Sequence, residues 1–283
     1  MILVFGKNGQ VAQALARASD EALCLGRTEA DLSVPDAAAK AIATHRPRAV
    51  INAAAYTAVD QAESAPDAAH RLNAGAVAEI AEACAAAQIP LVHLSTDYVF
   101  DGSGTAPRGP DAPTAPLGVY GASKLAGEDV IRASGATAVI LRTAWVFSAD
   151  GTNFVKTMLR LAESRDHLTV VADQIGAPTP AAAIAEACLT IAENLIRDPA
   201  KTGTYHFAGA PEVSWADFAR AIFATAERPV TVTDITTSDY PTPAVRPLNG
   251  RLDCHLTELT FGLPRPDWQA ALAEVITELE IST

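Results

Sequence analysis

The stretch MILVFGKNGQVA, residues 1–12, decides the fold of the N-terminal half. An apolar run typical of a buried strand leads into a turn with Gly6 and Gly9, and Ala12 follows in the predicted helix. Glycine accepts torsions that a side chain forbids and lets the backbone approach a phosphate, while a helix N-terminus offers free amides and a positive dipole end. An ordinary strand-to-helix turn can show the same residues, but a position directly after the first strand favours a dinucleotide site.

Apolar runs and alanine-rich amphipathic stretches alternate to about residue 150, which is the rhythm of βαβ units. We expect strands at 2–6, 22–26, 49–55, 91–96 and 137–147, and helices near 10–18, 35–45, 66–87 and 120–134. Because these strands lack strict polar alternation, they suit a parallel sheet covered on both faces. The predicted fold class is α/β, a doubly wound parallel sheet of the Rossmann type with a smaller, interwoven C-terminal α/β cap.

Two regions are expected, without a clean linker or an internal repeat between them. Residues 1–150 form the dinucleotide-binding domain, to which some later segments return, and residues 151–283 form a substrate-binding cap. Helices in the cap are predicted near 153–164, 180–196, 214–226 and 267–280.

Composition excludes several classes of protein. The chain has 283 residues, of which 49% are hydrophobic, so it can bury a sizeable core. A formal charge of -12 argues against binding nucleic acid or an anionic membrane, and no apolar run is long enough to span a bilayer. Four scattered cysteines and six scattered histidines predict reduced thiols, no metal site and a cytoplasmic location, since the N-terminus lacks a signal-peptide pattern.

The residue after the second strand bears on the choice of dinucleotide. An acidic residue there would bind the ribose 2′-hydroxyl of NAD, whereas this chain has Arg27, whose guanidinium matches a 2′-phosphate. NADPH is therefore predicted, with NADH still possible because arginines are common at strand ends. Asp31 and Leu32 are candidates to border the adenine, or they form a plain loop.

The stretch VYGASKLAGE, residues 119–128, pairs a phenol with an ammonium. Tyr120 and Lys124 are four residues apart, so they share one face of a helix. The ammonium is expected to stabilise the phenolate, lower the pKa of Tyr120 and hold the ribose of a nicotinamide cofactor. A pair of this spacing also arises by chance.

A second cluster of polar residues lies in HLSTDYVF, where the fourth strand is predicted to end. Ligands gather at the carboxyl ends of parallel strands. The hydroxyl of Thr96 could bind a substrate carbonyl together with Tyr120, although such a residue is more often part of a turn. Together with the glycine turn, these elements predict a dinucleotide-dependent oxidoreductase.

The sequence resembles the extended short-chain dehydrogenase/reductases, and among them those that reduce a nucleotide-linked 4-keto sugar. The resemblance covers nearly the whole chain and rests on FGKNGQVA, VINAAAYTAVDQAES, STDYVFDG, PLGVYGASKLAGE, LRTAWVF, NFVKTMLRLA, DQIGAPT, YPTPAVRPLNGRLD and PRPDW. The tyrosine motif marks the whole superfamily, whereas NAAAYTAVDQAES, STDYVFDG and DQIGAPT are narrower.

The resemblance implies roles for individual residues. Tyr120 would be the proton donor, Lys124 would tune it and hold the cofactor, and Thr96 would assist at the carbonyl. Implied cofactor contacts are Gly9, Gln10, Val11, Asp31, Leu32, Ala53, Ala54, Ala55, Tyr56, Thr57 and Leu94. Implied contacts to the nucleotide sugar, dTDP-4-dehydro-L-rhamnose, are Thr96, Asp97, Tyr120, Trp145 and Asn153, and Arg246 and Arg251 are candidates for its diphosphate.

One position departs from the resemblance, and alternatives stay open. Some relatives dimerise around a metal held by a glutamate on the first helix, where this chain has Ala14, so the protein is expected to be a metal-free monomer or homodimer. A related nucleotide-sugar epimerase or dehydratase would place more acidic groups beside Thr96. A catalytically silent NADP-binding subunit would not need intact Tyr120 and Lys124.

Overall fold

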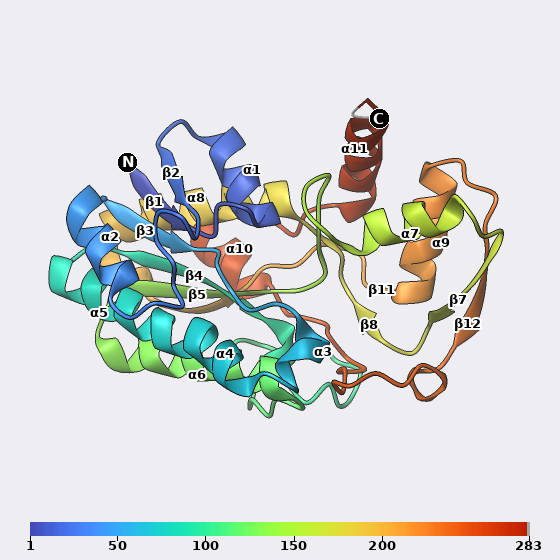
Figure 1. Ribbon diagram of the computed structural model, residues 1–283, viewed down its shortest axis with the longest axis horizontal. Coiled ribbons are helices and arrows are strands. Elements are labelled where there is room, and N and C mark those ends of the chain that lie inside the picture. Colours follow the sequence, from blue (N-terminus) through green and yellow to red (C-terminus); the bar gives the residue numbers. More distant parts are fainter. Residues whose placement is uncertain (282–283) are drawn as a thin grey trace.

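A parallel six-stranded sheet lies at the centre of the protein, which we describe from a computed structural model over residues 1–281 (Figure 1). The strands follow the order β10-β5-β4-β3-β1-β2. Their bounds are β1 Ile2–Phe5, β2 Ala22–Leu25, β3 Ala49–Asn52, β4 Leu91–Thr96, β5 Ala138–Thr143 and β10 Gly203–His206. Phe5 pairs with Leu25 and Asn52, and Thr96 pairs with Thr143, so the carboxyl ends of the strands share one edge.

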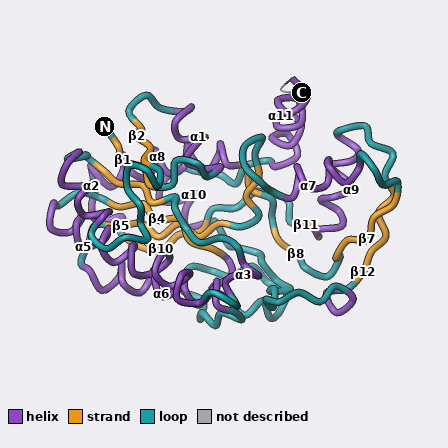
Figure 2. The backbone as a smooth tube through the Cα atoms, in the orientation of Figure 1, coloured by secondary structure: helices purple, strands orange, loops and turns teal. Residues whose placement is uncertain are grey.

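Helices cover both faces of this sheet (Figures 1 and 2). One face carries α1 (Gln10–Ala18) and α8 (Ala181–Arg197), and the other carries α2 (Ala37–His45), α5 (Ala76–Ala87) and α6 (Val119–Ser134). Alternate residues of β1 enter opposite cores: Ile2 and Val4 pack with α1 and α8, while Leu3 and Phe5 pack with the other layer. Burial on both sides explains why these strands show no polar alternation.

The structure differs most from the sequence prediction at two elements, and the strand predicted at 49–55 also ends earlier, at Asn52. The strand predicted at 137–147 is divided into β5 and β6 (Val146–Phe147), because Trp145 between them has a left-handed φ of 48°. The helix predicted at 66–87 is divided into α4 (Pro66–His70), a π-helical turn (Arg71–Gly75) and α5. Both breaks lie beside the candidate site.

The cap lies beyond the carboxyl edge of the sheet (Figure 1). Its helices are α7 (Phe154–Ala162), α9 (Trp215–Thr225) and α11 (Trp268–Ile281). Its short strands pair as β7 (His167–Val171) with β12 (Thr231–Ile235), β8 (Ile175–Gly176) with β11 (Val213–Ser214), and β6 with β9 (Thr179–Pro180). The remaining elements are α3 (Val59–Ala62), α10 (His255–Phe261) and short 3-10 turns at Asp97–Val99, Pro199–Lys201 and Thr237–Asp239.

Two later segments return to the sheet. Helix α8 covers one face, and β10 forms the edge strand beside β5, with Tyr205 paired to Leu141. The chain therefore crosses between the two regions more than once. Among residues 1–281, no helix combines the length and the apolar character that crossing a bilayer would require.

Candidate active site

The turn between β1 and α1 is tight at Gly6, whose φ of 107° favours glycine. A Cβ on Gly6 would lie 2.8 Å from the backbone nitrogen of Ala54, so a side chain would push the ends of β1 and β3 apart. Gly9 caps α1, and its N–H donates to the Gly6 carbonyl at 2.8 Å. No side chain caps the start of α1 in the described part of the chain, so its first amides can receive an anion.

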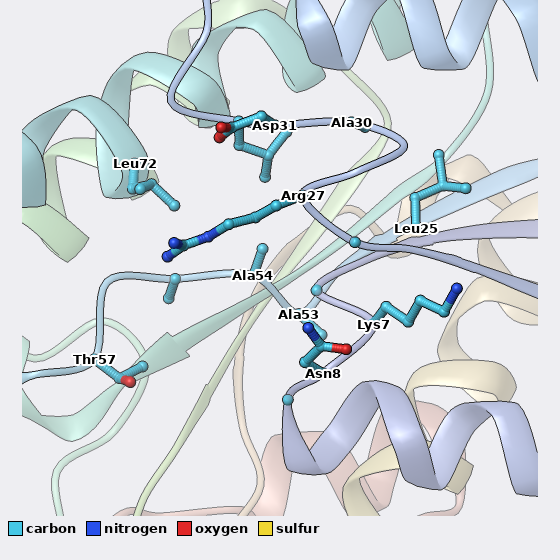
Figure 3. A pocket seen from close by; sticks show the side chains of 15 residues that line it. Lys7, Asn8, Leu25, Arg27, Ala30, Asp31, Ala53, Ala54, Thr57 and Leu72 are labelled. Carbon is cyan, nitrogen blue, oxygen red and sulfur yellow. The ribbon is translucent and has the colours of Figure 1, made fainter. Parts of the chain in front are cut away.

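A cavity of about 250 Å³, here called the N-terminal cavity, opens over this turn (Figure 3). It is lined by Gly6, Lys7, Asn8, Gly9, Leu25, Gly26, Arg27, Ala30, Asp31, Leu32, Ala53, Ala54, Ala55, Thr57 and Leu72. Arg27 reaches across the cavity between Asp31 and Ala54, whereas Lys7 points away from it (Figure 3) and pairs with Glu29 at 2.9 Å. Arg27 is thus the guanidinium that faces the ligand space.

Most of the predicted cofactor residues meet in this cavity, and the others lie elsewhere. Gln10, Val11, Tyr56, Leu94, Tyr120 and Lys124 are outside its lining. The Gln10 side chain turns inward, where Ser148 and Asn153 donate to its Oε1 at 2.9 Å. Sequence reasoning missed Lys7, Asn8, Leu25, Gly26 and Ala30, which are neighbours of residues it did find, and Leu72, which reaches the cavity from the π-helical turn and has no local signal.

Helix α6 carries the tyrosine and the lysine and packs very closely on its surroundings. A Cβ on Gly121 would lie 2.2 Å from the Tyr98 carbonyl oxygen, and one on Gly127 would lie 2.1 Å from the Asn73 carbonyl oxygen. The small residues of VYGASKLAGE therefore allow this helix to approach the loop after β4 and the π-helical turn. Glu63 fixes its start, because Val119 N–H donates to Glu63 Oε1 at 2.8 Å.

Tyr120 is partly buried beside the end of β4. Its ring meets the ring of Tyr98 edge to face with centroids 5.4 Å apart. Burial raises the pKa of Tyr120 to about 12, the hydrogen bond with Thr96 acts in the opposite direction, and the charge of Asp97 raises the pKa further. The pKa of Tyr120 is thus raised, whereas the sequence predicted that Lys124 would lower it. The ammonium of Lys124 donates to the Leu94 carbonyl instead.

The ammonium of Lys124 is buried under the sheet edge. Its Nζ donates to the Leu94 carbonyl at 2.7 Å and lies 3.4 Å from His93 Nε2. Burial lowers the pKa of Lys124 to about 8, although the charge of Glu128 acts against this shift. His93 in turn contacts Asn52 at 3.1 Å, and burial lowers the pKa of His93, so the ring is neutral.

Thr96 and Asp97 end β4 beside Tyr120, as the sequence predicts for the carboxyl edge. The Thr96 hydroxyl donates to Asp97 Oδ1 at 3.1 Å, and the Tyr98 N–H donates to Thr96 Oγ1 at 3.2 Å. The other carboxyl oxygen, Oδ2 of Asp97, is buried and has no hydrogen-bond partner among the described residues. Burial raises the pKa of Asp97 to about 7, so the group is about half protonated near neutral pH.

A buried ion pair lies below these residues and links α6 to the sheet. Arg142 on β5 donates to both carboxylate oxygens of Glu128, at 2.8 and 2.6 Å, and Ser95 donates to Glu128 Oε1 at 2.6 Å. Glu128 lies one turn after Lys124, and Ser95 precedes Thr96. The pair therefore fixes the helix that bears Tyr120 against the strand that bears Thr96. No local sequence pattern indicates this ion pair, because its partners lie on α6 and β5, which are separate elements.

A second cavity, here called the cap cavity, has a volume of about 540 Å³. It is lined by Tyr98, Phe154, Thr157, Met158, Leu161, Arg165, His167, Leu168, Thr169, Val170, Val171, Gln174, Trp215, Ile235, Tyr240, Thr242 and Arg246. Tyr98 connects it to Tyr120, because it contacts that ring and also forms part of this lining. The lining contains two arginines and no Asp or Glu, although acidic residues outnumber basic ones by 33 to 21 in the chain.

The remaining predicted substrate residues have different surroundings. Arg246 lines the cap cavity but pairs with Asp60 at 2.7 Å, and Arg251 folds back onto Asn249 at 3.0 Å and lines neither cavity. Asn153 does not fit the predicted contact to the sugar: it caps α7 and donates to Ser148 and Gln10, so its side chain is used within the protein. Trp145 is absent from the cap cavity lining as well.

A doubly wound parallel sheet, a glycine turn after its first strand and a Tyr-x-x-x-Lys helix at its carboxyl edge together define an oxidoreductase of the extended short-chain dehydrogenase/reductase class. The residues present also suit a bound NADP, because the start of α1 has no side-chain cap and can receive a phosphate, and Arg27 faces the cavity over that turn.

Comparison with known proteins narrows this class. The family model described as "RmlD substrate binding domain" matches residues 1–281. A dTDP-4-dehydrorhamnose reductase of Sinorhizobium fredii is 44% identical over 287 residues, which cover 98% of this chain and 97% of the relative. The protein belongs to this RmlD family of dTDP-4-dehydrorhamnose reductases.

Solved structures agree with the sequence relatives. A dTDP-4-dehydrorhamnose reductase from Clostridium acetobutylicum superimposes with a TM-score of 0.92 at 35% identity, covering 99% of each chain. The enzyme of that name from Bacillus anthracis, solved in complex with NADP, has a TM-score of 0.91 at 33% identity and covers 98% of each chain.

Proposed function

We propose that the protein uses NADPH to reduce the 4-keto group of dTDP-4-dehydro-L-rhamnose, which yields dTDP-L-rhamnose as the last step in making that nucleotide sugar. One observation carries the proposal: Tyr120 lies beside Thr96 at the sheet edge, and Tyr98 links it to a cavity without acidic residues. Such a cavity suits the nucleoside diphosphate of the substrate, because no carboxylate in its lining would repel the phosphates.

NADPH fits the N-terminal cavity through the residues already described. The free amides at the start of α1 would receive the pyrophosphate, and Arg27 would pair with the 2′-phosphate. Asn73 holds the backbone at Tyr56, which stabilises the loop that lines the other side of the cavity. When bound, the cofactor supplies the hydride.

Side chains of the protein supply the proton. Tyr120 donates its phenolic proton to the carbonyl oxygen of the substrate, and Thr96 hydrogen-bonds to the same oxygen, so negative charge is neutralised as it develops. Lys124 lies one helical turn after Tyr120, and its ammonium, which donates to the Leu94 carbonyl, would bind the cofactor ribose. The raised pKa keeps Tyr120 protonated across the neutral range, as a proton donor requires.

The reaction is tested by mixing the purified protein with NADPH and dTDP-4-dehydro-L-rhamnose and following the nicotinamide absorbance. We expect the absorbance to fall, and a Tyr120→Phe variant to slow the reaction by about a hundredfold or more, the usual contribution of a positioned proton donor. Tyr205→Phe is the matched control, because this tyrosine lies on the edge strand β10 and its hydroxyl donates to the Lys201 carbonyl. No absorbance change in the parent would favour a silent NADP-binding subunit, and a different sugar product would favour an epimerase or dehydratase.

Cofactor preference is tested with Arg27→Ala. We expect the variant to lose about tenfold or more in kcat/KM with NADPH, because a charge-assisted contact to the 2′-phosphate is removed, and to change little with NADH. Arg197→Ala, on the exposed end of α8, is the control. Equal losses with both cofactors would contradict the assignment of Arg27 to the 2′-phosphate.

We also propose a cytoplasmic location. The four cysteines are free thiols, and Cys84, Cys188 and Cys254 are buried, which suits a reducing compartment.

A further inference from the structure

A buried histidine, His93 on β4, lies beside the amine of Lys124. Its side chain is 0% exposed, and its partner in the sheet register is Asn52 of β3, which is 1% exposed. Nδ1 of His93 lies 3.1 Å from Asn52 Nδ2, and Nε2 lies 3.4 Å from Lys124 Nζ. The imidazole ring therefore lies between the two side chains, with one nitrogen toward each.

The orientation of Asn52 decides which nitrogen of His93 carries the proton. The backbone N–H of Ala54 can only donate, and it meets Asn52 Oδ1 at 3.1 Å. The other end of the amide, Nδ2, therefore points toward His93 and donates to Nδ1. A neutral imidazole has one donor and one acceptor nitrogen, so the ring proton of His93 is on Nε2.

This tautomer places an N–H bond opposite the amine of Lys124. The ammonium form of lysine has donors only, so two donors face each other across 3.4 Å and form no hydrogen bond. The neutral amine has an electron pair that can accept from His93 Nε2, while one of its hydrogens still donates to the Leu94 carbonyl at 2.7 Å. We infer that His93 is a positioning residue for Lys124, whose neutral form it favours through this N–H group.

Burial and charge at Lys124 are consistent with this role. Burial lowers the pKa of Lys124 to about 8, in the same direction as His93, whereas the charge of Glu128 on the same helix opposes the shift. The carboxylate of Glu128 is already bound by Arg142. The ionisable groups on the other elements packed against α6 have other partners or are exposed; they are Asp60 and Glu63 at α3, Asp67 and His70 on α4, Arg71 on the π-helical turn, Glu79 and Glu82 on α5, and Asp97 and Tyr98 after β4.

The first experiment determines the tautomer of His93 by NMR of protein that carries isotope-labelled histidine. The ring nitrogens are assigned by through-bond correlation to the backbone of β4, so no variant is needed. We expect a neutral ring with its proton on Nε2 across the neutral range, and an Nε2 signal that shifts near pH 8 as Lys124 titrates. Lys124→Met should remove this shift. A proton on Nδ1, or an imidazolium ring at neutral pH, would overturn the inference.

The second experiment measures kcat/KM against pH, and this part rests on the proposed function. The parent should lose activity above about pH 8, because the ammonium of Lys124 is needed at the cofactor ribose. His93→Phe keeps a ring but removes the N–H group, so the lysine should bind its proton about tenfold more tightly, as loss of one hydrogen bond predicts. The fall in activity should then move upward by about one pH unit.

His206→Phe is the matched control, because His206 is a second buried histidine, and its Nε2 lies 3.3 Å from Arg142, which does not lose its proton. The fall should stay in place in this variant. NADPH binding shows that each variant is folded. An unmoved fall in a folded His93→Phe protein would overturn the inference, and if that variant does not fold, the NMR tautomer decides. A parent without activity would contradict the proposed function instead, since the NMR experiment needs neither substrate nor turnover.

Discussion

Asp97 carries a carboxyl group that the surrounding protein makes a much weaker acid. It is 3% exposed, and Gly250 packs so closely that a Cβ there would lie 2.7 Å from Asp97 Oδ2. Hydrogen bonds from Thr96 and from nearby backbone amides stabilise the carboxylate, but the effect of burial is larger and raises the pKa to about 7. Asp97, which the resemblance to the family places against the nucleotide sugar, is thus a buried acid in the folded protein.

The raised pKa of Asp97 makes stability depend on pH with a definite sign. Above the unfolded pKa of about 4, the unfolded chain releases this proton while the native protein keeps it, so the free energy of unfolding falls as the pH rises toward 7. Asp97→Asn cannot ionise and should escape this loss. Between about pH 5 and about pH 8, the free energy of unfolding of the variant should rise relative to the parent by about 3 kcal/mol.

Urea denaturation of the parent and Asp97→Asn at both pH values measures this difference. Asp101→Asn is the control, because the Asp101 side chain is 42% exposed and its pKa is lowered by backbone and side-chain hydrogen bonds from Ser103. A constant difference between the parent and Asp97→Asn across the range would show that Asp97 ionises normally in the native protein.

Helix α6 contains glycines, although glycine has a low helix propensity, because its close packing leaves no room for a side chain at these positions. Glycine inside a helix costs about 1 kcal/mol relative to alanine, so local propensity alone would favour Gly127→Ala. The structure predicts the opposite result, because the added Cβ would lie 2.1 Å from the Asn73 carbonyl oxygen, a backbone atom that cannot swing away. Overpacking of this kind typically costs about 1–3 kcal/mol or more, which exceeds the gain in propensity.

Gly127→Ala should therefore lower the midpoint of thermal unfolding by several degrees, given that about 1 kcal/mol shifts it by about 2–4 °C in a protein of this size. Circular dichroism during heating measures this shift. Gly109→Ala is the matched control, because no atom lies within 4 Å of the position its Cβ would take. A stabilised Gly127→Ala variant would mean that α6 can move away from the π-helical turn without cost.

The π-helical turn before α5 places Asn73 under the cofactor loop. The Tyr56 N–H donates to Asn73 Oδ1 at 2.8 Å, and Asn73 Nδ2 donates to the Tyr56 carbonyl and to Ser123 Oγ on α6. One side chain thus joins the loop of the N-terminal cavity to the helix of the proton donor. Such turns often mark functional positions within helices, and this one has no recognisable pattern in the sequence.

Asn73→Ala should loosen that loop and raise KM for NADPH by about tenfold, with a smaller effect on kcat, because three hydrogen bonds to a buried amide are lost. Steady-state kinetics with varied NADPH separates the two constants. Asn194→Ala on α8 removes an amide that bonds within its own helix and to Lys201, and should leave KM unchanged. A fall in kcat alone would assign Asn73 to the chemistry instead of to the cofactor loop.

At the scale of the whole molecule, the sheet and the cap depend on each other. Helix α8 and strand β10 come from the second half of the chain but cover and extend the sheet of the first half. The buried residues of α8, among them Ile184, Cys188 and Ile191, pack against Val4, Ile51 and Val92 of the sheet. Without α8, these apolar side chains would face water.

A chain that ends at residue 150 should therefore fail to fold cooperatively, although it contains the glycine turn and the Tyr120–Lys124 pair. We expect it to bind a hydrophobic dye strongly and to lack a sharp urea transition, in contrast to the full chain. A fragment that binds NADPH and unfolds cooperatively would show that the first half is an independent domain.

Much of the fold followed from local sequence, because its signals depend on near neighbours. The strand, glycine turn and helix at residues 1–18 need only hydrophobicity, glycine torsions and helix periodicity, and the predicted and observed bounds of α1 agree. The same holds for Tyr120 and Lys124, since spacing alone places them on one helical face. The carboxyl end of β4 at Thr96 was likewise readable, and membership of the extended short-chain class followed from these motifs.

Only the tertiary structure decided the partners and the ionisation of the site. Burial set the pKa values of Tyr120 and Asp97, and an acid distant in sequence, Asp60, paired with Arg246. Trp215 stacks on Trp145, which is distant in sequence, and lies in the lining of the cap cavity. The physical reason is common to all: hydrophobic periodicity and torsional preference act between near neighbours, whereas desolvation, ion pairing and stacking depend on which distant segments the fold brings into contact.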